Sequence, residues 1–91
     1  MILTATFKSK GRAYSLSLDT EKPDRNYEDE NYAEWFVTAN DGRVLDVTVW
    51  KDEQGRFTND GIVEVYKNYG AFEDGTFLDK KSIKVHSYQI S

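Results

Sequence analysis

The sequence predicts an all-β fold, in the form of a small five-stranded antiparallel barrel. Apolar and polar residues alternate over 13–18, 44–50 and 62–66, a spacing typical of strands with one buried face. Glycine, asparagine and aspartate separate these runs, as they do at the turns of antiparallel hairpins. Because 91 residues support one hydrophobic core, we expect a single domain over residues 1–91.

The first third of the chain combines strand and loop signals. Residues 2–18 predict either one long strand bent near Gly11 or two strands joined by a tight turn there. The following segment, 19–33, is rich in aspartate and asparagine and contains the single proline, Pro23. This composition predicts a long polar loop, and long loops are often functional.

A hairpin is expected over residues 34–50. Its turn sequence, Asn-Asp-Gly at 40–42, is a strong hairpin signal. The register matters, because a slip of one residue would reverse the faces of both strands. We prefer a bulged turn that pairs Ala39 with Arg43, since this register places Trp35 in the core.

That register sorts the side chains of the hairpin into two faces. Asp46 and Thr48 are polar, which marks their face as the outward one, and Phe36 and Trp50 share it. The inward positions of all strands together form the predicted core: Leu16, Leu18, Trp35, Val37, Leu45, Val47, Val49, Val63, Val65, Ile83 and Val85.

The C-terminal half predicts a second hairpin. A charged turn at 51–60 precedes a strand at 62–69, and a glycine-containing loop at 70–75 leads into a final strand at 76–90. We expect at most one short helix, located within 19–34 or within the charged turn.

This element order is that of a five-stranded OB barrel, with an SH3-like barrel or a small β-sandwich as the alternative. The run DGRVLDVTVWKD resembles the second and third strands of OB domains in the replication protein A group, and IVEVYKNYGAFEDGTFLDKKSIKV is similar to their closing hairpin. SKGRAYSLSL resembles a stretch of filamentous-phage single-stranded DNA-binding proteins. The resemblance implies binding of single-stranded DNA or RNA on the barrel face.

Single-strand binding requires exposed aromatic rings for base stacking and cations along the backbone path. Trp50 is the leading stacking candidate, because it shares a face with Asp46 and Thr48; the other interpretation is that it caps the core at a strand end. The predicted nucleic-acid-binding residues are Tyr14, Phe36, Arg43, Trp50, Lys51, Tyr66, Lys67, Tyr69 and Phe72. Further cations that could neutralise phosphates are Lys10, Arg12, Lys80, Lys81 and Lys84.

The net charge of −4 supports a second hypothesis, a small acidic module that binds a basic protein partner or mimics nucleic acid. Residues 19–34 hold seven acids against two bases. The small size and the composition suit a phage-encoded inhibitor. The candidate partner-binding residues are Tyr27, Glu28, Asp29, Glu30 and Tyr32. Exposed strand edges would also suit a homodimer.

Other classes of function have little support in the sequence. The chain has no cysteine, and its single histidine, His86, lies in a plain alternating strand. GxxxxGK[ST], GxSxG and HExxH patterns are absent, so we expect neither catalysis nor a cofactor or metal. No apolar run approaches the roughly 20 residues that span a membrane. The N-terminus does not resemble a signal peptide, so a cytoplasmic location is expected.

Overall fold

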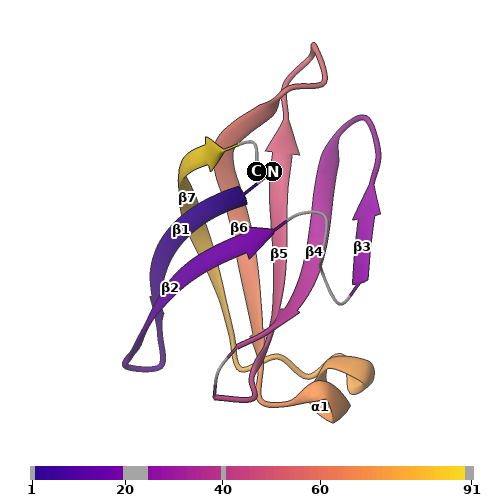
Figure 1. Cartoon of the computed structure of the whole chain (residues 1–91). Coiled ribbons are helices and arrows are strands. Elements are labelled where there is room, and N and C mark those ends of the chain that lie inside the picture. Colours follow the sequence, from indigo (N-terminus) through magenta and orange to yellow (C-terminus); the bar gives the residue numbers. More distant parts are fainter. Residues whose placement is uncertain (1, 20–24, 40, 90–91) are drawn as a thin grey trace.

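The computed structural model describes residues 2–19, 25–39 and 41–89, which form one curled antiparallel sheet (Figure 1). Within these ranges the sheet has seven strands: β1 (Ile2–Ser9), β2 (Arg12–Asp19), β3 (Arg25–Glu28), β4 (Tyr32–Thr38), β5 (Val44–Lys51), β6 (Phe57–Tyr66) and β7 (Asp79–Gln89). One short helix, α1 (Tyr69–Asp74), lies between β6 and β7. The predicted all-β class is confirmed, whereas the expected count of five strands is wrong.

The strands lie in the order β2-β1-β7-β6-β5-β4-β3, and the sheet curls into a half-barrel. Pairing of β1 with β7 joins the first and last strands, so β2 and β3 become the two edges. In Figure 1, β2 passes in front of β7 and β6, and its arrowhead reaches β5. The curl therefore creates an inner, concave face and an outer, convex face.

Residues 2–19 form two strands joined by a tight turn, which was one of the two arrangements expected from the sequence. Lys10 and Gly11 connect β1 to β2, with φ angles of 51° and 77°. Positive φ at both central residues is the geometry of a two-residue hairpin turn, and Gly11 adopts it without steric cost. The expectation of an uninterrupted loop over 19–33 is wrong, because β3 and the start of β4 lie within that range; residues 20–24 are outside the described part of the chain.

The bulged register of the central hairpin is confirmed. The Ala39 amide donates a hydrogen bond to the Arg43 carbonyl at 2.7 Å, and Phe36 lies directly opposite Asp46. The next connection is shorter than predicted, since β6 begins at Phe57 rather than near residue 62. The Asp52 carboxylate accepts hydrogen bonds from backbone amides of that tight turn, which explains how so few residues reverse the chain.

The helix lies outside the two segments predicted for it. The Asn68 side chain accepts a hydrogen bond from the Ala71 amide at 2.9 Å, and Gly75 ends the helix with φ of 76°. This N-cap and C-cap pair accounts for one and a half turns of helix where the sequence predicted a loop. The strand that follows accordingly begins at Asp79 rather than at residue 76. Within the described ranges, no helix is long and apolar enough to cross a membrane.

The core occupies the concave side of the sheet. Ten of the eleven predicted core residues are buried, and the remaining one, Val37, is half-buried and packs against them. Leu3, Ala5 and Ala33 belong to the core as well. The predicted inward face is therefore correct on every strand to which it was assigned.

Candidate interaction site

Three aromatic side chains gather on the outer face, at the edge of the sheet where β3 ends, β4 begins and β5 ends. Tyr27, Tyr32 and Trp50, here called the outer aromatic cluster, come from these three strands in turn. Ring centroids lie 5.5 Å apart for Tyr27 and Tyr32, and 6.0 Å apart for Tyr32 and Trp50 in an edge-on contact. Tyr27 is 50% exposed and Trp50 is 41% exposed, so both rings present apolar surface to solvent.

The turn between β3 and β4 holds this cluster in place. The Asp29 carboxylate accepts hydrogen bonds from the amides of Asn31 at 2.7 Å and Tyr32 at 3.0 Å. These bonds lower the pKa of Asp29, because they favour its charged form. The Tyr27 hydroxyl donates to the same carboxylate at 3.3 Å, and the negative charge of Asp29 raises the pKa of Tyr27. Asp29 is therefore a structural residue of the turn.

Acidic side chains surround the cluster. Glu28 and Glu30 are exposed on the β3–β4 hairpin, and Glu34 lies directly opposite Tyr27 in the sheet. Lys51, the basic residue next to Trp50, pairs with Glu28 and lies 5.2 Å from the centre of the Phe57 ring. Its side chain is only 11% exposed. Because Glu28 follows Tyr27 directly in β3, its side chain points to the opposite face, so Glu34 is the acidic residue that shares the outer face with Tyr27.

A row of carboxyl groups continues from the cluster across the outer face. Glu34, Asp46 and Glu64, here called the carboxyl strip, stand on the neighbouring strands β4, β5 and β6. Asp46 lies opposite Glu64, which in turn lies opposite Lys80 on β7. Repulsion between nearby carboxylates on one face disfavours full ionisation of the strip.

Asp46 is the buried member of the strip. It is only 6% exposed, and its Oδ1 atom has no hydrogen-bond partner. Burial raises the pKa of Asp46 to about 8, and Glu34 and then Glu64 add to the rise. At neutral pH the Asp46 carboxyl is therefore largely protonated. Its outward direction was predicted, but its burial was not.

A second aromatic group lies at the opposite end of the outer face, around α1. The Phe72 ring contacts Phe36 at 4.8 Å, Tyr66 at 5.2 Å and Tyr69 at 5.6 Å between centroids. Tyr66 is only 6% exposed, and burial raises the pKa of its hydroxyl. These rings pack the helix onto the sheet, while Tyr69 remains 44% exposed.

Tyr14 and Arg43 lie in a third place, at the rim of the concave face. The Tyr14 hydroxyl donates to Asp41 at 3.3 Å and accepts from the Arg43 guanidinium at 2.9 Å. Arg12 completes the network with a hydrogen bond to Asp41 at 3.1 Å. The backbone amide of Arg43 also donates to Asp41, and this bond is the main cause of the lowered pKa of that carboxyl.

The structure thus divides the predicted nucleic-acid-binding residues among three regions. Trp50 and Lys51 lie at one end of the sheet, the aromatic residues around α1 lie at the other end, with Lys67 exposed just before the helix, and Tyr14 and Arg43 lie on the rim. Lys80 and Lys84 are exposed on β7, and Lys84 pairs with Asp60. The five predicted partner-binding residues, in contrast, lie together on the β3–β4 hairpin.

Sequence reasoning counted Glu34 among the acids of residues 19–34 but did not place it beside Asp46, missed Glu64, and treated Asp46 as an exposed residue. A signal existed: each occupies an outward position on a strand next to the others, so the confirmed register places them side by side. Among residues 2–19, 25–39 and 41–89, no group of three His, Cys, Asp or Glu side chains could hold a metal ion. The side chain of His86 is not among those described.

Comparison with models of protein families, with curated proteins and with solved structures gives no match to this chain. The geometry of the outer face therefore carries the functional argument.

Proposed function

We propose that this protein is an interaction module that binds a basic protein partner through the outer aromatic cluster. The observation that supports the proposal is the joint placement of two exposed aromatic rings and an acidic hairpin on one end of the sheet. Buried aromatic anchors surrounded by polar residues are the usual energetic centre of protein interfaces. Trp50 and Tyr27 would serve as the anchors.

The charges favour a cationic partner. Glu34 shares the outer face with the rings, Glu30 is exposed in the adjoining turn, and Lys51 is already paired with Glu28 on the opposite face. An approaching lysine or arginine would meet a negative potential at the rim of the contact, which speeds association and selects the partner. The net charge of −4 acts in the same direction.

Binding of single-stranded nucleic acid is the second candidate. The exposed rings of Trp50 and Tyr27 favour it, because bases stack on accessible aromatic faces with about 1–3 kcal/mol each. The positions of the cations count against it. Of the expected phosphate contacts, Arg43 precedes the opposite end of β5 and is bonded to Tyr14, and Lys67 follows β6 just before α1.

Two matched charge reversals separate the candidates. Glu30→Lys adds positive charge beside the cluster, whereas Glu73→Lys makes the same change on α1, and both residues are exposed. Asp29 is left unchanged, since its carboxylate orders the turn. Each variant is immobilised and tested for capture of partners from lysate, and each is titrated with a labelled oligothymidylate at about 20 mM salt, where phosphate contacts are strongest.

For a basic protein partner, Glu30→Lys should lower capture about tenfold and Glu73→Lys should leave it unchanged. For nucleic acid, Glu30→Lys should instead strengthen oligonucleotide binding, because it adds a cation next to the stacking rings. Trp50→Ala should weaken either interaction, by about 2 kcal/mol if Trp50 is an anchor. Unchanged capture by Trp50→Ala and Glu30→Lys alike would contradict the proposed surface.

A further inference from the structure

The two edges of the sheet differ in how they are protected against pairing with another chain. β3, at one edge, is four residues long and has charged residues at both ends, Arg25 and Glu28. β2, at the other edge, is eight residues long, pairs with β1 without a bulge, and has no charge and no proline over residues 13–18. Short strands, charges, prolines and bulges are the usual devices that keep a sheet edge from pairing. β2 lacks them over this range, so its edge is open to an added strand.

The backbone of β2 supplies hydrogen-bonding groups along this edge. The β1–β2 turn has two residues with positive φ, and in such a hairpin the residues that flank the turn, Ser9 and Arg12, pair by hydrogen bonds. Bonded and non-bonded pairs then alternate along the two strands. Within the described part of the chain, β1 is the one strand that pairs with β2. The residues whose N–H and C=O groups point away from β1 are therefore Ala13, Ser15 and Ser17.

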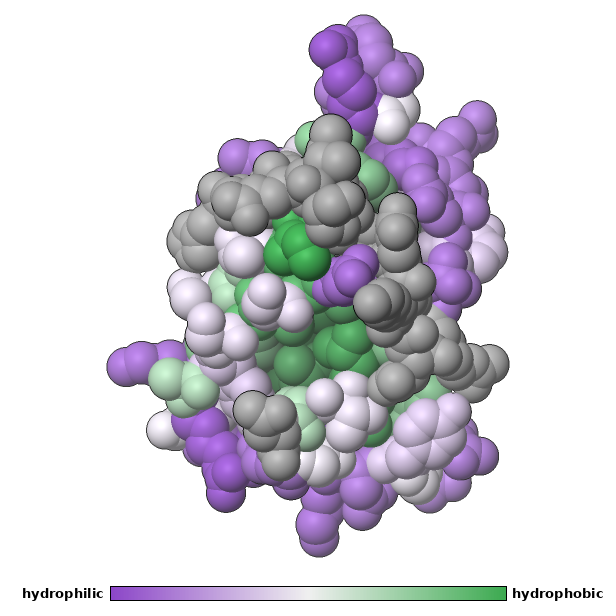
Figure 2. Space-filling model, in the orientation of Figure 1, coloured by the Kyte–Doolittle hydropathy of each residue, from purple (hydrophilic) through white to green (hydrophobic). Residues whose placement is uncertain are grey.

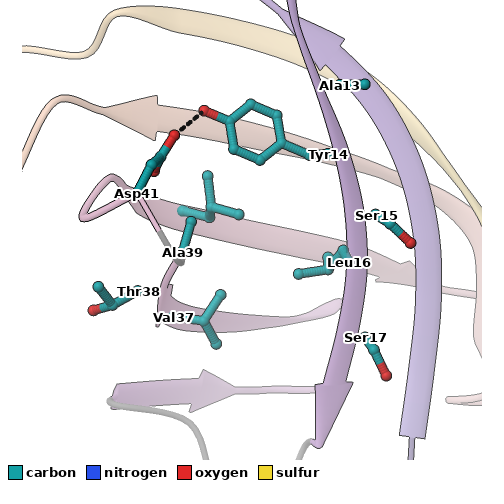
Figure 3. A pocket seen from close by; sticks show the side chains of 10 residues that line it. Ala13, Tyr14, Ser15, Leu16, Ser17, Val37, Thr38, Ala39 and Asp41 are labelled. Carbon is teal, nitrogen blue, oxygen red and sulfur yellow. Dashed lines mark hydrogen bonds between the residues drawn. The ribbon is translucent and has the colours of Figure 1, made fainter.

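The same edge lines a cleft of about 540 Å³ in the concave face. Its walls are residues 13–17 of β2 and residues 37–39 at the end of β4, together with Asp41 and Leu45. Consecutive side chains of a strand point to opposite faces, so a cleft that contacts every residue of such a run follows the edge of the strand. In Figure 3, Leu16 points from β2 into the cleft, whereas its neighbours in the strand point away.

The cleft suits a single extended segment with alternating side chains. Figure 2 shows apolar residues at the bottom of a hollow in this face, and Leu16, Val37 and Leu45 belong to the core or pack against it. An extended segment could place every second side chain on this floor and the others toward solvent. Asp41 is the one charged side chain among the lining residues, and it is already bonded to Arg12. The segment that fits is therefore uncharged.

We propose that an uncharged, extended peptide of a partner protein binds in this cleft as an additional strand beside β2. Main-chain hydrogen bonds to Ala13, Ser15 and Ser17 would provide affinity, and the aliphatic floor would select apolar side chains at alternate positions. A second copy of this chain fits less well, because its own β2 is joined to β1 and the cleft is bounded on both sides, by β2 and β4. The proposal does not depend on the function assigned to the outer face.

The test uses a capped peptide in which valine and threonine alternate, with one lysine at each end, beyond the cleft, for solubility. Hydrogen exchange of the backbone amides is followed by NMR with and without this peptide. An added strand should slow exchange at Ala13, Ser15 and Ser17 and leave Tyr14 and Leu16 unchanged, because the latter two amides are already bonded to β1. A peptide of the same composition with its valines grouped together should bind about tenfold more weakly, since some valines then face solvent.

Two substitutions at one position isolate the main-chain bond. Ser15→Pro removes an outward N–H and should lower the affinity for the alternating peptide about tenfold, whereas Ser15→Ala keeps that N–H and should bind as the parent protein does. Proline is tolerated in an edge strand where the N–H faces solvent, and a melting curve checks that Ser15→Pro is folded. Trp50→Ala should also bind this peptide normally, which separates the cleft from the outer aromatic cluster.

The exchange pattern of the parent protein decides the question even if Ser15→Pro does not fold. Uniform slowing along β2, equal binding of the two peptides, or equal binding by folded Ser15→Pro and Ser15→Ala would overturn the proposal. Slower exchange at Ala13, Ser15 and Ser17 on raising the protein concentration alone would also overturn it, because the edge would then pair with a second copy.

Discussion

The two faces of β5 are buried to nearly the same degree, yet they have opposite chemistry. Leu45, Val47 and Val49 point into the concave core and are at most 3% exposed. Asp46 and Thr48 point to the convex side and are only 6% and 7% exposed. The inner side chains are covered by the curl of the sheet. In the sheet, Asp46 lies opposite Phe36 and Glu64, and Thr48 lies opposite Glu34 and Ile62.

This difference separates stability from function within one strand. Apolar burial on the inner face stabilises the fold by about 25 cal/mol per Å² removed from water. Burial of a carboxyl group on the outer face is unfavourable unless the group is paired or protonated. Perturbed carboxyl groups of this kind are common at functional sites. The outer face thus holds the buried carboxyl group of Asp46, and the exposed rings of Tyr27 and Trp50 lie on the same face.

The two tryptophans, one on each face of the sheet, give the strongest test of this difference between the faces. Trp35 is 3% exposed on the inner face and contacts Phe57 at 5.8 Å between ring centroids. Trp35→Ala should lower the free energy of unfolding by about 3–5 kcal/mol, through lost burial and the cavity left behind. Urea denaturation measures this directly. A loss below 1 kcal/mol would mean that the inner face is not the core.

Gly61, which lies opposite Val49 in the β5–β6 pair, offers the next largest effect. A Cβ atom at this position would lie 2.1 Å from the Thr48 carbonyl oxygen, which belongs to the backbone and cannot move aside alone. Gly61→Ala should therefore cost about 1–3 kcal/mol or more, as overpacking does. Gly70→Ala is the matched control, because its nearest contact is 3.4 Å and it lies in α1. That variant should be neutral or slightly stabilising in the same urea assay.

The inner face could be predicted from sequence, because alternation within each strand identifies which side chains are buried together. The register of the central hairpin also followed, from the requirement that Trp35 and Val37 face inward. The strand count was too low by two. Residues 2–18 form β1 and β2, the alternative that the five-strand count had not used, and β3 was missed because it is four residues long and lies in a charged segment. Helix α1 was missed because its caps, Asn68 and Gly75, also suit a loop.

The candidate sites were predicted only in part. Grouping of Tyr27 with Tyr32 follows from their proximity in sequence, and their contact with Trp50 follows from the β4–β5 register. The Arg12–Asp41–Tyr14–Arg43 network could not be anticipated, because it depends on how far the sheet curls to bring β2 toward the β4–β5 turn. Curvature is a property of the whole sheet and leaves no local pattern in the sequence.

An effect of opposite sign is expected when Asp46 is replaced. The folded state retains the Asp46 proton up to a pKa of about 8, whereas an unfolded chain releases it near 3.9. Between these values the folded state binds more protons, so this group's contribution to stability is present at low pH and is lost as pH rises. Stability should therefore fall from pH 4 to pH 8 through this group by up to about 5 kcal/mol, because each of the roughly four pKa units corresponds to about 1.4 kcal/mol.

Asp46→Asn should remove most of that dependence and raise the melting temperature at pH 8. Thermal unfolding of both proteins across this pH range gives the comparison. Glu34→Gln should lower the pKa of Asp46, since Glu34 is the main charged group that raises it, and the fall in stability should then be smaller and end at lower pH. Glu64, Tyr66 and Lys80 face the same side chain and are left unchanged. Parallel pH curves for the parent protein and Asp46→Asn would show that Asp46 is not the titrating group.

The smallest effect on stability is expected at the other tryptophan. Trp50 is 41% exposed on the outer face, and its recorded ring contact is the edge-on one with Tyr32. Trp50→Ala should change the free energy of unfolding by no more than about 0.5 kcal/mol, as surface substitutions usually do. Acrylamide should quench Trp50 fluorescence but hardly that of Trp35, so quenching should largely disappear in this variant. If Trp50→Ala instead lowered the free energy of unfolding by several kcal/mol, Trp50 would be a packing residue. That result would contradict the proposal that the outer aromatic cluster is an interaction surface.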